Sequence, residues 1–186
     1  MREQLSTSIL QAKRFEIFTY DRSIIPVLVP FLPFRSEIII SSFELDEISL
    51  DTDFFDLEVI RTARELLIIH EVKIIDEQLG RLQAYSLQIR SPLLTSQSIN
   101  GLILQWLNGR RKIALIKIQT DKVLQWNELL NGIDPAQIRD LDDSHRHFSK
   151  RVPIASRKLI QSKYGSILIG KDNDTCALEF SVKNVA

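Results

Sequence analysis

Apolar and polar side chains alternate along several short stretches of this chain. Residues 15–20 and 113–118 follow that alternation, and residues 36–42 carry a β-branched run. A period of two is typical of a strand with one buried face, and a β-branched run favours a buried strand. The segments 166–169 and 176–182 predict a closing hairpin, because a polar turn sequence separates them.

The stretch from residue 59 to residue 89 supports two interpretations. Residues 63–66 favour a helix, whereas the long β-branched run that ends at Ile75 favours a strand. We predict a strand from about Arg64, because a second β-like run follows at residues 82–89. The polar residues 76–80 between the two runs then predict a hairpin connection.

Helical periodicity is the second pattern. It predicts helices over residues 3–13, 98–108 and 154–163. Gly109 stands where a glycine commonly ends a helix, and Asp134 followed by Pro135 predicts the start of a further helix. The apolar, proline-rich stretch 24–34 predicts an irregular segment or a short broken helix.

This order of elements predicts an α+β protein with a mostly antiparallel sheet flanked by helices, because hairpins join most strands and helices gather between them. The chain has 186 residues, of which 44% are hydrophobic. That is enough for the core of one domain over residues 1–186. No segment repeats at a fixed period, and no linker divides the chain.

Charge is divided unevenly along the chain although its net value is zero. Residues 37–77 carry twelve acids and three bases, residues 78–120 carry six bases and no acid, and residues 144–171 carry seven bases and no acid. Folding could mix these segments into a neutral surface. Alternatively, one face could be positive and suit a small anionic ligand or another anionic partner.

Cysteine usage and hydropathy bear on the compartment. The single cysteine, Cys176, cannot form an internal disulfide, which favours a reducing compartment. The first residues lack the apolar core of a signal peptide, and the apolar stretch 24–34 is too short for a bilayer and contains three prolines. We therefore predict a cytoplasmic protein without a membrane span.

Metal sites and nucleophile motifs are weakly represented. His145 and His147 lie beside two aspartates, but their spacing matches no zinc pattern. Glu71 and Lys73, with aspartates upstream, resemble a magnesium-dependent nuclease motif only in part. A glycine-rich phosphate loop and a Gly-x-Ser-x-Gly elbow are both absent from the sequence. We predict no metal and no cofactor.

Two basic clusters leave nucleic-acid binding open as an alternative. The first consists of Arg110, Arg111 and Lys112, and the second of Lys150, Arg151, Arg157 and Lys158. Such residues contact phosphates, but few aromatic residues stand between them, and helix ends or loop surface explain them equally well.

Three segments, in order, resemble the chorismate pyruvate-lyase family. Residues 15–23 leading to 36–40 are similar to its opening strand, Asp-x-Ser turn and second strand. Residues 63–68 and 82–87 resemble its Arg-Glu-apolar strand and returning strand, and residues 164–180 resemble its closing hairpin. The middle departs from the family, because residues 112–115 lack its turn glycine and residues 120–122 lack its Thr-Arg pair.

The resemblance implies an antiparallel sheet with helices, an enclosed pocket without metal, and the conversion of chorismate to 4-hydroxybenzoate and pyruvate. Chorismate carries two carboxylates, and Arg64 falls on the family's arginine position, where it would bind one of them. Glu179 falls on the position of a buried carboxyl that would act as acid or base. The departures leave open a non-catalytic ligand-sensing or protein-interaction module on the same fold.

Overall fold

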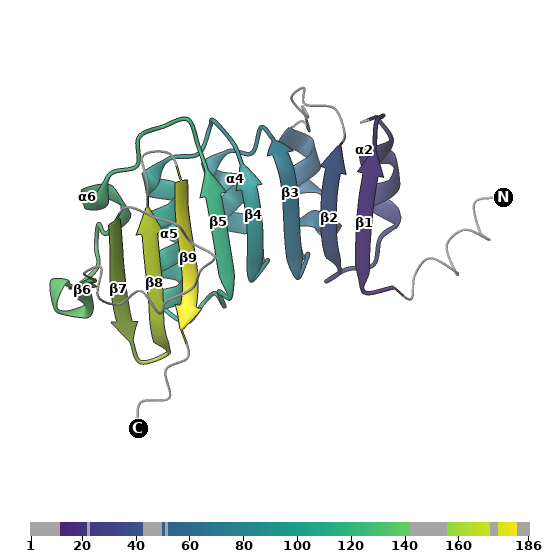
Figure 1. Cartoon of the computed structure of the whole chain (residues 1–186). Helices are drawn as coiled ribbons and strands as arrows, with labels where there is room; N and C mark the ends of the chain where they lie inside the picture. The colour runs from purple at the N-terminus through teal and green to yellow at the C-terminus, as the bar shows by residue number, and fades with distance from the viewer. Residues whose placement is uncertain are drawn as a thin grey trace.

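A computed structural model describes residues 12–21, 23–42, 50, 52–141, 156–171 and 175–181. Nine strands form one sheet in the order β1-β2-β3-β4-β5-β9-β8-β7-β6 (Figure 1). The strands are β1 (Arg14–Thr19), β2 (Glu37–Ser42), β3 (Glu65–Glu71), β4 (Ser86–Arg90), β5 (Leu115–Gln119), β6 (Ile138–Asp140), β7 (Ser156–Ser162), β8 (Gly165–Lys171) and β9 (Thr175–Ser181).

Short helices connect the strands within the described residues. The α-helices are α2 (Ile24–Leu28), α3 (Glu58–Arg61), α4 (Asp76–Arg81), α5 (Ser96–Leu107) and α6 (Trp126–Leu129). Three 3-10 turns accompany them: η1 (Val29–Phe31), η2 (Thr52–Asp56) and η3 (Pro135–Gln137). In the described ranges none of these helices is long and apolar enough to cross a membrane.

The first half of the sheet is parallel. Strands β1 to β5 each pair with the next in parallel, and a helix or 3-10 segment follows each of the first four before the chain returns. These strands begin at residues 14, 37, 65, 86 and 115, so successive units are 23, 28, 21 and 29 residues long. Each unit consists of one strand and the one or two helical segments that follow it. The parallel half is therefore a stack of strand–helix units.

The second half of the sheet is antiparallel. Strand β9 joins the two halves by pairing with β5, and β8, β7 and β6 follow it outward. β7 and β8 form a tight hairpin through Lys163 and Tyr164.

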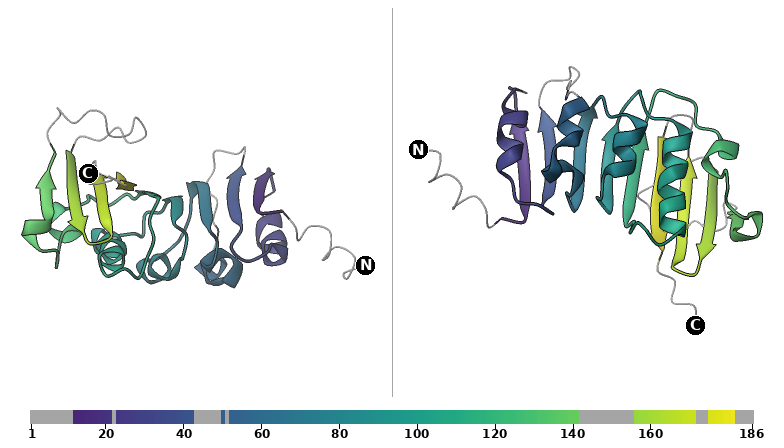
Figure 2. Two further views of the ribbon diagram at one scale, coloured as in Figure 1. Left: turned by 90° about the horizontal axis from the view of Figure 1, so that it is seen from below. Right: turned by 180° about the vertical axis from the view of Figure 1, so that it is seen from behind.

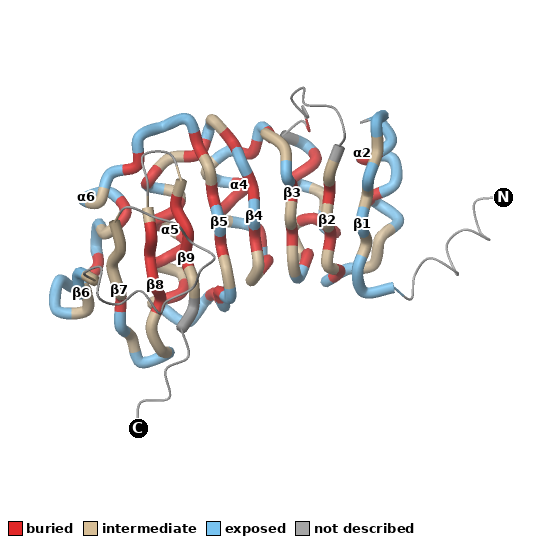
Figure 3. Tube along the Cα trace, viewed as in Figure 1, coloured by how far each residue is buried: buried red, intermediate tan, exposed pale blue. Residues whose placement is uncertain are grey.

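The hydrophobic core lies between the sheet and the helices, which cover a single face of β1 to β5 (Figure 2). Ile38, Ile40, Leu66, Ile68 and Leu87 alternate along their strands and are buried against that helical layer. The intervening residues of the same strands are exposed or half-buried (Figure 3). The period of two along these strands therefore separates a core face from an uncovered face.

The α+β class is confirmed, but the sheet is mixed rather than mostly antiparallel. The predicted hairpin between residues 64–75 and 82–89 is wrong, because β3 and β4 pair in parallel. The connecting residues form α4, in which Gln78 and Leu79 are buried. Gln78 donates from Nε2 to Asp56 Oδ2 at 2.9 Å and accepts at Oε1 from the Ile75 amide at 3.2 Å. These bonds stabilise a helical turn in the segment whose polar sequence predicts a hairpin connection.

The predicted helix over residues 154–163 is also wrong, because Ser156–Ser162 forms β7 and pairs with β8 along its whole length. Asp134 accepts a hydrogen bond from the Ala136 amide at 2.9 Å, as expected of a helix cap, but the helix is only the 3-10 turn η3.

Several other predicted elements are confirmed within a few residues. They are the strands near residues 15–20, 36–42 and 113–118, the broken helix after residue 24, the helix that precedes Gly109, and the closing hairpin. The predicted helix at residues 3–13 lies outside the described residues, apart from its last two positions.

Candidate functional site

The face of β1 to β5 that no described helix covers is here called the open face. Side chains from five strands lie on it in rows set by the strand pairing. They are Arg14, Glu16, Phe18, Glu37, Ile39, Ser41, Glu65, Leu67, Ile69, Glu71, Ser86, Gln88, Arg90, Leu115, Lys117 and Gln119. None of these side chains is fully buried.

The centre of the open face is apolar. Ile39 of β2 and Leu67 of β3 are direct neighbours in the parallel register, and Ile69 lies two residues further along β3. Ile69 is 56% exposed and Phe18 on β1 is 55% exposed, which is unusual for side chains of this size. The open face therefore presents apolar groups to the surroundings.

Charges on the open face separate by strand. β1 to β3 contribute Glu16, Glu37, Glu65 and Glu71 against one base, Arg14, which bonds Glu16 at 2.7 Å. β4 and β5 contribute the bases Arg90 and Lys117 and no acid. The charge division found along the sequence thus becomes a division across the sheet, with an acidic side on β1–β3 and a basic side on β4–β5.

Arg64 lies at the amino-terminal end of β3, immediately before the first residue of that strand. Its Nε donates to Tyr85 Oη at 2.7 Å and its guanidinium lies 5.2 Å from the centre of that ring. Tyr85 in turn donates to Glu65 Oε1 at 3.1 Å. The hydrogen bond with Tyr85 raises the pKa of Arg64, with smaller contributions from the charges of Glu37 and Glu65. Arg64 is thus an exposed cation whose donors are partly engaged.

Glu179 is half-buried on β9, opposite Leu115 of β5 and Leu168 of β8. Its Oε2 is buried and has no hydrogen-bond partner among the described residues. A single row of the sheet runs from Glu65 through Ser86 and Leu115 to Glu179. Three strand spacings of about 4.8 Å therefore separate Glu179 from Glu65, roughly 14 Å in all.

The backbone positions of Arg64 and Glu179 lie about three strands apart in the sheet. Neither residue lines the two hollows described next. The two side chains that the resemblance assigns to one pocket are thus apart.

The first hollow, of about 740 Å³, lies beside the N-terminus of α5 and has mostly polar walls. Asp76 accepts from the Thr95 amide at 3.0 Å and from Thr95 Oγ1 at 2.6 Å, and Asn100 Nδ2 donates to the carbonyls of Leu129 and Asn131 at 2.9 Å each. Its polar groups therefore serve to join loops to helices.

The second hollow, of about 640 Å³, is here called the Arg111 hollow. Its walls are mainly apolar and come from Tyr85, Trp106, Gly109, Arg111, Lys112, Ile113, Ala114 and Tyr164. It lies where α5 ends, where β4 and β5 begin, and where the β7–β8 turn approaches them. Sequence reasoning missed this site, because its walls come from three segments that lie far apart in the sequence.

The basic cluster at residues 110–112 divides into two environments. Arg110 and Lys112 are exposed, whereas Arg111 is buried and only 8% exposed. Lys150 and Arg151 lie outside the described residues. Arg111 thus lies in the wall of the second hollow, and nucleic-acid binding through this cluster stays a prediction.

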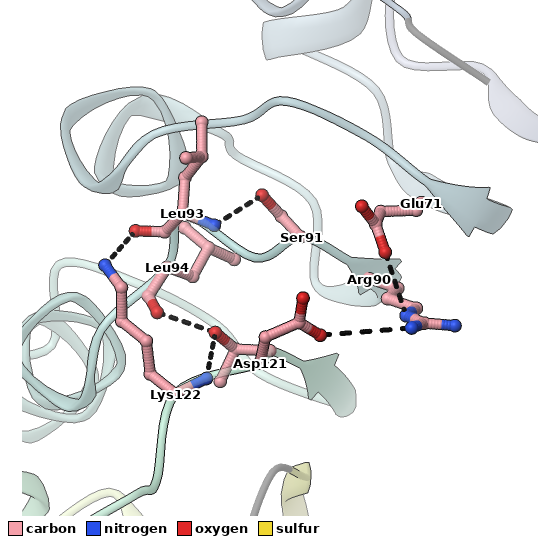
Figure 4. A network of polar contacts seen from close by, with 8 residues as sticks. Glu71, Arg90, Ser91, Leu93, Leu94, Asp121 and Lys122 are labelled. Atoms are coloured by element: carbon pink, nitrogen blue, oxygen red, sulfur yellow. Dashed lines mark hydrogen bonds and ion pairs between the residues drawn. The ribbon is translucent and has the colours of Figure 1, made fainter. Parts of the chain in front are cut away.

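The carboxyl ends of β3, β4 and β5 carry a polar network (Figure 4). Arg90 bonds Glu71 at 3.3 Å and lies 3.9 Å from Asp121. Lys122 Nζ donates to the Leu93 carbonyl at 2.8 Å, and Thr120 Oγ1 donates to the Leu94 carbonyl at 2.8 Å. These contacts link the ends of adjacent strand–helix units on this side of the sheet.

No group of three potential metal ligands occurs among the described residues, and His145 and His147 lie outside them. Glu71, part of the nuclease-like pattern, is engaged by Arg90.

Comparisons with protein-family models, with curated proteins and with solved structures gave no match.

Proposed function

We propose that this protein is a non-catalytic protein-binding module and that the open face of β1 to β5 is its recognition surface. The observation that carries this proposal is the one-sided covering of the parallel half. Helices bury one face of five strands, while an apolar centre with a charged border remains uncovered on the other.

The composition of the open face supports protein recognition. Protein interfaces combine an apolar centre with a polar rim, and clustered exposed apolar side chains mark such sites. Ile39, Leu67 and Ile69 supply the centre, and Glu37 and Glu65 lie in the neighbouring row. Stacked strand–helix units also form extended surfaces that bind proteins, although a fold alone does not establish a function.

The charge distribution specifies the chemistry of the partner. The acidic side on β1–β3 attracts lysine and arginine, and the basic side on β4–β5 attracts carboxylates. The partner is therefore a polypeptide with an apolar anchor, basic residues on one side of it and acidic residues on the other. Association should slow as salt is added, because screening weakens attraction between exposed charges.

A peptide-display selection tests this proposal. Random peptides are selected on the wild-type protein and then counter-selected on an Ile69→Glu variant. We expect enriched peptides to carry an apolar anchor beside lysine or arginine. Synthetic peptides should bind Ile69→Glu at least tenfold more weakly, because a carboxylate replaces the apolar centre.

Val123→Glu is the matched control for this experiment. Val123 is 65% exposed, like Ile69 a β-branched residue, and it lines the polar hollow beside α5 instead of the open face. The control should keep wild-type affinity within about twofold. Equal losses in both variants, or no enriched peptide at all, would reject the open face as the recognition surface.

Chorismate pyruvate-lyase activity, with a lyase-like fold, stays a prediction from the resemblance. Its specific support in the structure is the buried, unpartnered Oε2 of Glu179, a feature that an acid–base carboxyl can show. The separation of Arg64 and Glu179 favours the binding module instead. Incubation with chorismate, with 4-hydroxybenzoate followed by chromatography, decides between them. Turnover that Glu179→Gln abolishes would establish the enzyme and overturn the non-catalytic proposal.

A further inference from the structure

We infer that the Arg111 hollow is a binding site for a small carboxylate with an apolar ring, held by the guanidinium of Arg111 and by aromatic walls. The site is separate from the open face, so this inference does not depend on the protein-binding proposal.

The first argument is the state of Arg111. Only one hydrogen bond of its guanidinium is formed among the described residues, from Nη2 to the Ala84 carbonyl at 3.0 Å. Its Nε is buried without a partner. No described acid forms an ion pair with it, and burial alone lowers its pKa to about 10. A cation buried without a counter-charge is costly, and an anion in the hollow would compensate it.

The second argument is the shape and lining of the hollow. Tyr85, Trp106 and Tyr164 contribute aromatic side chains, and Ile113 adds an aliphatic one. A volume of about 640 Å³ lies within the range of small-molecule pockets, which combine apolar walls with few polar groups. The exposed Lys112 stands in the lining as a second cation.

The backbone keeps this hollow in place. Gly109 has a φ of +70°, and a Cβ atom at this position would lie 2.5 Å from the Tyr164 ring. The positive φ favours glycine at this turn after α5, and a larger side chain would force the far end of the exposed Tyr164 side chain to move. The β7–β8 turn, distant in sequence, is thereby placed beside the segment that carries Arg111.

A planar guanidinium and aromatic walls together select the ligand class. Arginine binds a carboxylate through two parallel hydrogen bonds, and a flat ring stacks on aromatic side chains. A neutral isostere should fill the same space without supplying the charge. Benzoate is therefore the probe and benzamide its neutral counterpart.

The test is a ligand-observed NMR titration of the whole protein with each probe. We expect saturable benzoate binding with a Kd below about 1 mM. Benzamide should bind at least tenfold more weakly. Arg111→Gln should raise the Kd for benzoate at least tenfold, because Gln can still donate to the Ala84 carbonyl but carries no charge.

Arg110→Gln is the matched control, because it removes the same charge from the exposed neighbour. It should change the Kd by less than about twofold. Ala114→Leu supplies a second variant if Arg111→Gln does not fold, since it fills the hollow and leaves Arg111 in place; it should also abolish binding. The inference is overturned if benzoate does not saturate, if benzamide binds equally well, or if Arg110→Gln weakens binding as much as Arg111→Gln.

Discussion

The parallel and antiparallel halves of one continuous sheet differ in the burial of the face that points away from the helices. In β1 to β5 the face away from the helices has no fully buried side chain among the described residues. In β8 and β9 the corresponding face carries Leu168 and Ala177, which are 3% and 2% exposed. The same sheet therefore combines five strands that bury one face with two strands, β8 and β9, that also bury residues on the other.

This difference shows that strand direction alone does not determine how many faces of a sheet are buried. Parallel strands are usually covered on both faces and then read as continuous apolar runs. Here every crossover helix of the parallel half lies on the same side, so its strands alternate as antiparallel strands commonly do (Figure 2). The face left free by that arrangement is the one proposed to bind a partner.

The largest expected effect contrasts the two faces of β3. Leu66→Ala should lower the free energy of unfolding by about 2–5 kcal/mol, because Leu66 is fully buried beneath the helices. Leu67→Ala, the adjacent open-face control, should cost less than about 1 kcal/mol. Urea denaturation measures both. Similar losses for the two variants would show that the open face is packed against something in the folded protein.

The next effect tests the second half. Leu168→Ala should cost about 2–4 kcal/mol, because this side chain is buried on the face that is uncovered in β1 to β5. The comparison is again Leu67→Ala, which lies on that same face of the sheet in the other half. If the Leu168 variant is as mild as the Leu67 variant, the two halves do not differ in the way described here.

A smaller, pH-dependent effect comes from Cys176 on the core side of β9. Burial raises the pKa of this thiol from 9.0 to about 12. Its neutral form is therefore retained in the fold, and its contribution is complete below pH 9 and lost as pH rises toward 12. The wild type should lose about 1.4 kcal/mol per pH unit more than Cys176→Ala above pH 9.

Urea denaturation of both proteins at pH 8 and pH 10 measures this difference, because all other titrating groups are common to the pair. In the folded wild type the thiol should also resist iodoacetamide and become reactive in urea. Parallel stability curves for the two proteins, or rapid alkylation without urea, would contradict the buried neutral thiol.

The smallest effect concerns the network at the carboxyl ends of the parallel strands. Arg90 and Glu71 lie 3.3 Å apart, but the Arg90 side chain is 47% exposed. A double-mutant cycle with Arg90→Gln and Glu71→Gln should give a coupling of about 0.2–1 kcal/mol that decreases in high salt. A coupling above 2 kcal/mol would mean that this pair, instead of core burial, holds the units in register.

Local patterns predicted many elements because they depend on neighbours in the sequence. The alternation in residues 15–20 gave β1, the stripe before Gly109 gave α5, and the polar turn after Lys171 gave the closing hairpin. The wrong predictions concerned which strands pair with each other and whether a segment has the period of a helix or of a strand. Residues 76–80 read as a turn because they are polar, yet Leu79 is buried and the segment is helical.

The candidate sites were less predictable than the fold. Arg64 and Glu179 were chosen from short motifs, and the register places them about three strands apart. The Arg111 hollow had one visible signal, a basic run after a helix-ending glycine, but this signal does not distinguish the exposed Arg110 from the buried Arg111.

By itself the sequence determined the α+β class, the presence of a single thiol and the uneven distribution of charge, because composition and short-range periodicity carry that information. Only the tertiary structure decided strand direction, the open face and the Arg111 hollow. Parallel and antiparallel partner strands satisfy the same backbone hydrogen-bonding groups. Both can show the same alternation of apolar and polar residues, so the pattern of a strand does not identify the strand beside it. That choice depends on where each helix packs, which is a contact between residues far apart in the chain.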